Sequence, residues 1–156
     1  MTERLTKLSR SVDGSTVIVT GAASGMGRAT AHLFADEGAK VALIDIDESG
    51  LNRVVDEIRT VSDNVLCLVV DLSDRLSVER AVSHVIEHYG GLDILVNNAG
   101  FATPAAIDSE VFERVWSRSL DVMATAQAWA IRAALPGLRQ SDHPVSYTHL
   151  RAHETS

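Results

Sequence analysis

The chain has 156 residues, of which 46% are hydrophobic and 22% charged, and its formal net charge is −7. This length fits one globular domain, and the negative charge argues against a surface for nucleic acid or anionic membranes. The polar N-terminus lacks the apolar core of a secretory signal, and no apolar run could span a bilayer, so we expect a cytoplasmic protein. The single cysteine, Cys67, lies in an apolar run and is expected in the core.

Apolar runs alternate with helical patterns after a polar segment at residues 1–14. The predicted strands are continuous apolar runs, which are typical of strands buried on both faces of a parallel sheet: Ser15–Thr20, Val41–Ile44, Val65–Val70 and Leu92–Val96. Apolar residues at helical spacing predict helices over Arg28–Glu37, Leu51–Ile58, Val78–Ile86 and Ser109–Leu138. The alternation predicts an α/β fold, a Rossmann-type doubly wound parallel sheet with strand order 3-2-1-4.

A glycine-rich loop, Gly21–Gly27, joins the first predicted strand to the first helix. Such a turn presents free backbone N–H groups at the positive end of a helix dipole, where a pyrophosphate can bind, although the loop alone could be an ordinary turn. Asp45 favours a pyrophosphate site over an ordinary turn, because dinucleotide folds place an acid after the second strand to accept hydrogen bonds from the adenosine ribose hydroxyls. The N-cap role falls to Asp47. A carboxylate at Asp45 repels a 2′-phosphate, and no Lys or Arg stands in the loop or directly after Asp45, so NAD is preferred over NADP.

Motifs at the ends of the predicted strands resemble those of the classical short-chain dehydrogenase/reductase family. Thr20–Gly27 has the form T-G-x-x-x-G-x-G, Asp71-Leu72 closes the third strand, and Asn97–Gly100 reads N-N-A-G after the fourth. The resemblance covers residues 12–143. It implies NAD as the cofactor, with NADP less favoured, and a small-molecule alcohol or ketone as the substrate.

The resemblance also implies which residues contact the cofactor. From the pyrophosphate through the adenosine to the nicotinamide ribose, these are Gly21, Ser24, Gly25, Met26, Gly27, Asp45, Asp71, Leu72, Asn98, Ala99 and Gly100. Asn97 is expected to be structural, because its amide can bond two backbones and tie the fourth strand to the glycine loop.

The family moves a proton with a serine, a tyrosine and a lysine, and none of these is recognised here, so no catalytic residue is assigned. The only lysines are Lys7 and Lys40. The fourth position after Tyr147 holds Arg151, whose permanent charge makes it a poor proton relay. The family's helix asparagine, counted back from a proline, falls on Met123.

The last residues do not continue the fold pattern. Residues 144–156 read PVSYTHLRAHETS, without apolar periodicity, and Val145–Thr155 resembles a translated sequencing adapter. We therefore expect 1–143 to be an incomplete Rossmann domain, truncated after the fourth strand and its following helix. Residues 144–156 are expected to be a non-native tail.

The sequence therefore predicts an NAD(P)-dependent oxidoreductase that transfers hydride between NAD and an alcohol or carbonyl substrate, present as a fragment. A non-catalytic NAD-binding module is the alternative, and the motifs disfavour an S-adenosylmethionine enzyme. The parent protein is expected to be a homo-oligomer, although the apolar stripe of the long helix could equally be core: Val122, Ala126, Trp129 and Ala133. No metal site is assigned, and His84 and His88 are interpreted as solvent-facing.

Overall fold

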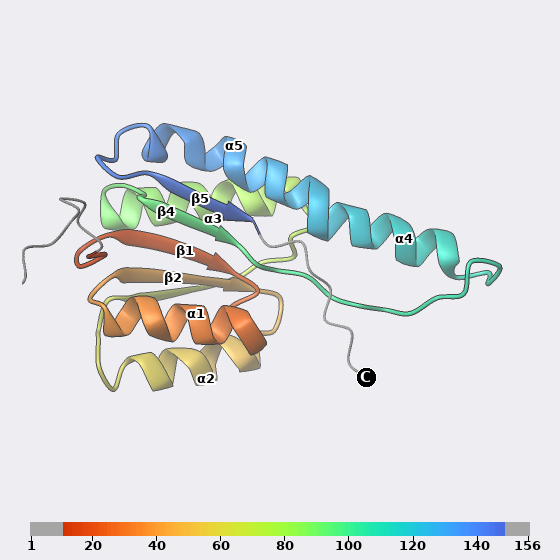
Figure 1. Cartoon of the computed structure of the whole chain (residues 1–156), viewed down its shortest axis with the longest axis horizontal. Coiled ribbons are helices and arrows are strands. Elements are labelled where there is room, and N and C mark those ends of the chain that lie inside the picture. Colours follow the sequence, from red (N-terminus) through yellow and green to blue (C-terminus); the bar gives the residue numbers. More distant parts are fainter. Residues whose placement is uncertain (1–10, 149–156) are drawn as a thin grey trace, which may run out of the picture.

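The computed structural model describes residues 11–148, which form a five-stranded, all-parallel sheet with helices on both faces (Figure 1). The strand order is β3-β2-β1-β4-β5. The predicted doubly wound fold is confirmed, as is the order of the first four strands.

The elements follow the predicted alternation. The strands are β1 (Thr16–Thr20), β2 (Lys40–Asp45), β3 (Val65–Val69), β4 (Ile94–Asn97) and β5 (Val145–Thr148). The helices are α1 (Gly25–Asp36), α2 (Glu48–Ile58), α3 (Arg75–Tyr89), α4 (Phe112–Leu120) and α5 (Ala126–Leu138), with a π-helical turn η1 (Asp121–Thr125) between the last two.

The sheet separates two apolar cores. Side chains alternate across a strand, so Val17 and Val19 of β1 pack with α1 and α2, whereas Ile18 packs with α3 and α5 on the other face. All three side chains are fully buried. β1 is the central strand of the sheet. Because the strands are parallel, the loops after β1, β2, β3 and β4 lie at one edge of the sheet, where open parallel sheets bind ligands.

The third strand is less buried than predicted. β3 lies at an edge of the sheet, its first four residues are only partly buried, and Val69 is 53% exposed. Cys67 is partly buried and packs against the α1–α2 core. The continuous apolar run therefore belongs to an edge strand. Its side chains pack against the helices on the two faces of the sheet, but no further strand among the described residues pairs with its outer side.

The structure adds a fifth strand beyond the predicted fourth strand and its following helix, whereas the expected truncation of the domain stays a prediction. Val145–Thr148 forms β5, which pairs in parallel with β4, and the Val145 N–H donates to the Asp93 carbonyl at 2.9 Å. The Asp93 carboxylate accepts from the Thr16 N–H at 2.8 Å and from the Ser141 hydroxyl at 2.6 Å, which joins β1, β4 and the approach to β5. Strand pairing uses backbone groups, so it needs no apolar periodicity. Residues 149–156 of the predicted tail lie outside the described residues.

The long predicted helix is divided in three and projects from the domain. α4 has no buried residue and extends beyond the sheet in Figure 1, with Trp116 57% and Leu120 45% exposed. The apolar stripe further along is mostly core: Val122 and Ala126 are buried, and Trp129 packs against the α3–α5 core.

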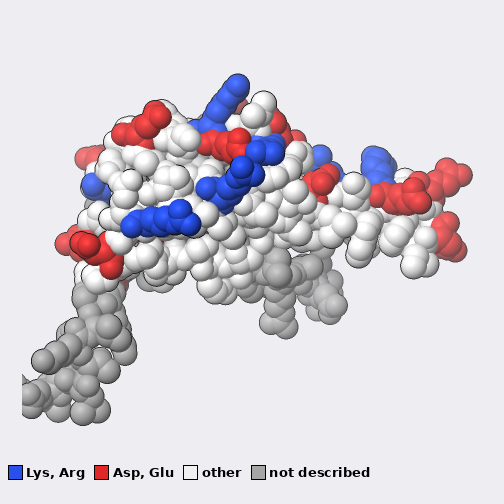
Figure 2. Space-filling model, turned by 90° about the horizontal axis from the view of Figure 1, so that it is seen from above, with Lys and Arg blue, Asp and Glu red and all other residues white. Residues whose placement is uncertain are grey.

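The surface above α5 and α4 mixes both signs of charge around uncharged areas (Figure 2). His84 and His88 of α3 are exposed, as predicted. No helix within residues 11–148 combines the length and the apolar character needed to cross a bilayer.

Candidate functional site

A pocket of about 150 Å³ opens at the carboxyl ends of the strands. Six of the eleven predicted cofactor residues line it, so the loops after β1, β2, β3 and β4 meet there: Gly21, Asp45, Asp71, Leu72, Ala99 and Gly100. The volume is below the roughly 300–1,000 Å³ of pockets that enclose a whole drug-sized ligand. It therefore suits one ring system, with the rest of a larger ligand lying outside.

Gly27 is where α1, the glycine loop and the end of β4 come closest. A Cβ atom on Gly27 would overlap the carbonyl oxygen of Gly21 and lie 2.6 Å from the Asn98 Nδ2 atom. No other residue type fits this close approach. The glycine therefore sets the distance between the start of α1 and the strand ends.

The last three residues of the glycine loop before Gly27 face solvent. Ser24, Gly25 and Met26 are exposed at the N-terminus of α1, and the Ser24 side chain makes no capping hydrogen bond to the helix. Gly25 adopts a φ of 52°, a conformation that side chains disfavour, and nothing lies within 4 Å of a Cβ built on it. Exposed N–H groups of the first turn, beside an open glycine, form the arrangement that binds phosphate.

Thr20 and Asn98 tie β4 to the glycine loop. The Asn98 side chain donates to the carbonyls of Thr20 at 3.0 Å and Gly21 at 3.4 Å. The Thr20 hydroxyl accepts from the N–H groups of Asn98 and Ala99 and donates to the Val96 carbonyl. The structural role expected of Asn97 therefore belongs to Asn98, because side chains alternate along the strand and Asn97 points to the other face.

Asn97 instead lies beside a second, smaller cavity behind the loop. It is 1% exposed, Gln127 of α5 is 8% exposed, and their side-chain amide nitrogens lack a hydrogen-bond partner among residues 11–148. Both line a cavity of about 10 Å³ together with Thr20 and Ala99. A cavity of that size holds about one water molecule, which could accept from a buried amide.

Asp45 braces the loop from the end of β2. Its carboxylate accepts from the Ala23 N–H and from the Asp47 N–H, both at 3.0 Å. Asp47 caps α2 as predicted, accepting from the Gly50 N–H. A carboxylate offers about four acceptor positions, so Asp45 keeps acceptor capacity toward the pocket that it lines.

Asp71 is held in its ionised form. The Ser73 hydroxyl and backbone N–H both donate to Asp71 Oδ1, at 2.7 and 2.9 Å, and these bonds hold the pKa of Asp71 below its usual range, helped by the charge of Arg118. Asp71 Oδ2 lies 3.9 Å from an Arg118 guanidinium nitrogen. Oδ2 remains available to a donor on a ligand.

Sequence reasoning missed five residues that line the main pocket: Ile46, Val70, Phe101, Arg118 and Val122. Three of them directly adjoin predicted site residues, a signal that could have been used. Arg118 and Val122 are four residues apart and share a helix face, but only the tertiary structure brings that face to the pocket.

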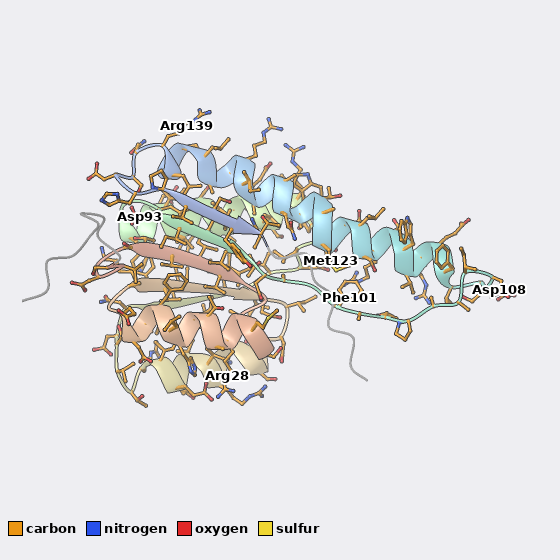
Figure 3. The ribbon with its side chains drawn as sticks, viewed as in Figure 1. Arg28, Asp93, Phe101, Asp108, Met123 and Arg139 are labelled. Carbon is orange, nitrogen blue, oxygen red and sulfur yellow. The ribbon has the colours of Figure 1, made fainter. Side chains whose placement is uncertain are left out.

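Met123 holds the position at which the family resemblance expects a helix asparagine, and it lies near the site. Its sulfur lies 3.5 Å from where a Cβ atom would stand on Gly100, and Figure 3 shows Met123 and Phe101 toward the carboxyl end of β4. A thioether is a weak acceptor and no donor, so Met123 cannot replace an asparagine in hydrogen bonding. Tyr147 lies in β5 and is 54% exposed.

Comparison with known proteins agrees with this geometry. The family described as short chain dehydrogenase matches residues 15–143. The chain is 38% identical over 128 residues to a 2,5-dichloro-2,5-cyclohexadiene-1,4-diol dehydrogenase of Sphingobium indicum, covering 82% of this chain and 51% of that protein. It is 35% identical over 146 residues to mouse 17-beta-hydroxysteroid dehydrogenase 13, covering 92% of this chain and 48% of that protein.

A third relative is the secoisolariciresinol dehydrogenase of Forsythia intermedia, 36% identical over 137 residues, covering 85% of this chain and 49% of that protein. The chain thus spans about half the length of the curated relatives it matches. The parallel sheet, the glycine loop and these matches together show that the chain belongs to the short-chain dehydrogenase family.

Proposed function

We propose that the chain binds NAD across the carboxyl ends of β1–β4, as the nucleotide-binding part of an oxidoreductase. The observation that carries this proposal is the meeting of Asp45, Asp71 and Gly100 around one pocket, next to the exposed N-terminus of α1. Adenine fits the pocket, with its amino group donating to Asp71. The pyrophosphate lies on Ser24–Gly27, and the nicotinamide ribose lies over Asn98–Gly100.

NAD is preferred over NADP because the charge at the ribose position is negative. Asp45 repels a 2′-phosphate, and the nearest arginine after the loop is engaged elsewhere. Arg28 donates from Nε and Nη2 to the two carboxylate oxygens of Glu57, each at 2.8 Å. This bidentate pair directs the guanidinium of Arg28 toward α2.

An Asp45→Ala variant should bind NAD about ten- to hundred-fold more weakly, since hydrogen bonds to a charged group contribute about 1.5–3 kcal/mol. Its affinity for NADP should change much less, because the lost ribose contacts are offset by the lost repulsion. Calorimetric titration of the 156-residue chain with each dinucleotide measures both affinities. Asp56→Ala is the control, an equal change of charge at an exposed position of α2. Equal losses for NAD and NADP would refute the assignment of Asp45.

We further propose that the whole protein oxidises an alcohol or reduces a ketone, and that the 156-residue chain binds NAD without turnover. The sequence offers no tyrosine followed four residues later by lysine, and a positioned acid or base is typically worth about 10²–10⁴-fold in rate. The chain should bind NAD in a titration, yet form no NADH from a panel of secondary alcohols. Alcohol-dependent NADH formation by this chain would contradict the proposal and make Tyr147 a candidate for the proton transfer.

We also propose that the parent protein is a homo-oligomer. The support is the apolar surface of α4, where Trp116 and Leu120 are about half-exposed and no residue is buried.

A further inference from the structure

Arg118 is the one cation among the described residues that line the main pocket, and the cofactor assignment gives it no role. It projects from α4, which follows β4, whereas the acidic residues of the pocket are Asp45, at the end of β2, and Asp71, after β3. Its side chain is half-exposed, and α4 contributes no residue to either core. Arg118 is therefore not needed to hold the fold together.

We propose that Arg118 is a binding residue for the cofactor, and that its guanidinium stacks on the face of the adenine ring. This inference rests on the proposed NAD site and adds to it a residue that the family motifs do not contain.

Asp71 offers one of its two carboxylate oxygens to a ligand. Ser73 donates twice to Oδ1, while Oδ2 lies 3.9 Å from the Arg118 guanidinium. An adenine amino group that donates to Asp71 would therefore meet Oδ2. Arg118 and the adenine ring would then both lie next to Asp71 Oδ2.

An amino group on adenine donates in the plane of the ring, so Asp71 Oδ2 would stand at the ring edge. At 3.9 Å the Arg118 guanidinium nitrogen is beyond hydrogen-bond distance of that oxygen, so the in-plane position at Oδ2 is left to the amino group and the guanidinium would lie above the ring face. Val122, one turn after Arg118, also lines the pocket, so this face of the helix is directed toward the ring.

A guanidinium suits this position better than an ammonium group. It is planar, delocalised and weakly hydrated, and it stacks on aromatic and base rings, whereas an ammonium group is a compact and strongly hydrated charge. The ion pair with Asp71 is 3.9 Å long and attracts the half-exposed guanidinium without fixing it by a hydrogen bond. The guanidinium could therefore stack on the ring while it stays close to Oδ2.

The test compares Arg118→Met and Arg118→Lys with Arg114→Met, a control at an exposed residue of the same helix that does not line the pocket. Each full-length variant is titrated by calorimetry with NAD and with nicotinamide hypoxanthine dinucleotide, whose purine lacks the amino group. Circular dichroism verifies that each variant is folded. We expect Arg118→Met to weaken both dinucleotides by about ten-fold, because each purine has a face on which to stack. Arg118→Lys should show about the same loss.

Arg114→Met should stay within about two-fold of the unaltered chain, as is usual for surface substitutions. The inference is overturned if Arg118→Met matches that control or if lysine restores the affinity. It is also overturned if the loss is confined to NAD, since Arg118 would then act only by positioning Asp71. If the unaltered chain binds neither dinucleotide, the proposed function fails as well, so the two failures are distinguishable.

Discussion

A Gly27→Ala variant is expected to lose about 3 kcal/mol or more of unfolding free energy, at the upper end of what overpacking costs, together with its affinity for NAD. The added methyl group would overlap the Gly21 carbonyl oxygen and approach the Asn98 amide at 2.6 Å. The first of these is a backbone atom of a loop braced by Asp45, and the second is the side chain that ties β4 to that loop. Neither can withdraw without separating α1 from the strand ends.

Thermal unfolding by circular dichroism measures the loss of stability, and calorimetry with NAD measures the loss of binding. A loss of about 3 kcal/mol from a chain of this size lowers the Tm by roughly 6–12 °C. Gly91→Ala is the matched control, because Gly91 has nothing within 4 Å of the added atom and does not have a positive φ. If Gly27→Ala has the same Tm and the same affinity for NAD as Gly91→Ala, the loop can move away from the added methyl group and the close approach at Gly27 is not required.

The parts of the fold that the sequence predicted correctly are those set by local chemistry. Buried parallel strands need continuous apolar runs, and three of the first four strands lie inside the sheet as a result. The start of one helix was also readable, since Asp47 caps α2 as predicted. The glycine loop was recognisable because a close backbone approach excludes side chains, as Gly27 illustrates.

The features that could not be predicted from the sequence depend on tertiary contacts between elements. β5 carries no apolar pattern because its four residues are exposed, and it is held by backbone pairing to β4. The roles of Asn97 and Asn98 differ only through the face of β4 on which each side chain falls. Arg118 of α4 lines the pocket, which the helical pattern alone does not reveal.

The contribution of β5 leads to the second large expected effect. A chain ending after His143 should aggregate, whereas one ending after Thr148 should behave like the full chain. Without β5 the outer N–H and C=O groups of β4 are unpaired, including the Asp93 carbonyl that accepts from the Val145 N–H, and an unpaired edge favours association. Losing several backbone hydrogen bonds at about 0.5–1.5 kcal/mol each would remove roughly 2–4 kcal/mol from a net stability of about 5–15 kcal/mol.

Light scattering after size-exclusion chromatography and thermal unfolding distinguish the two chains at equal concentration. Within the longer chain, Val145→Pro removes the N–H that bonds to Asp93 and fixes the backbone φ at that position. Val145→Ala keeps the N–H and shortens the side chain, so the pair distinguishes strand pairing from side-chain packing. We expect the proline variant to resemble the chain ending after His143, and the alanine variant to resemble its parent. If the shorter chain is monomeric with an unchanged Tm, β5 adds nothing to the fold. That result would favour the interpretation of residues 144–156 as a segment foreign to the domain, because a native strand on a parallel sheet contributes to its stability.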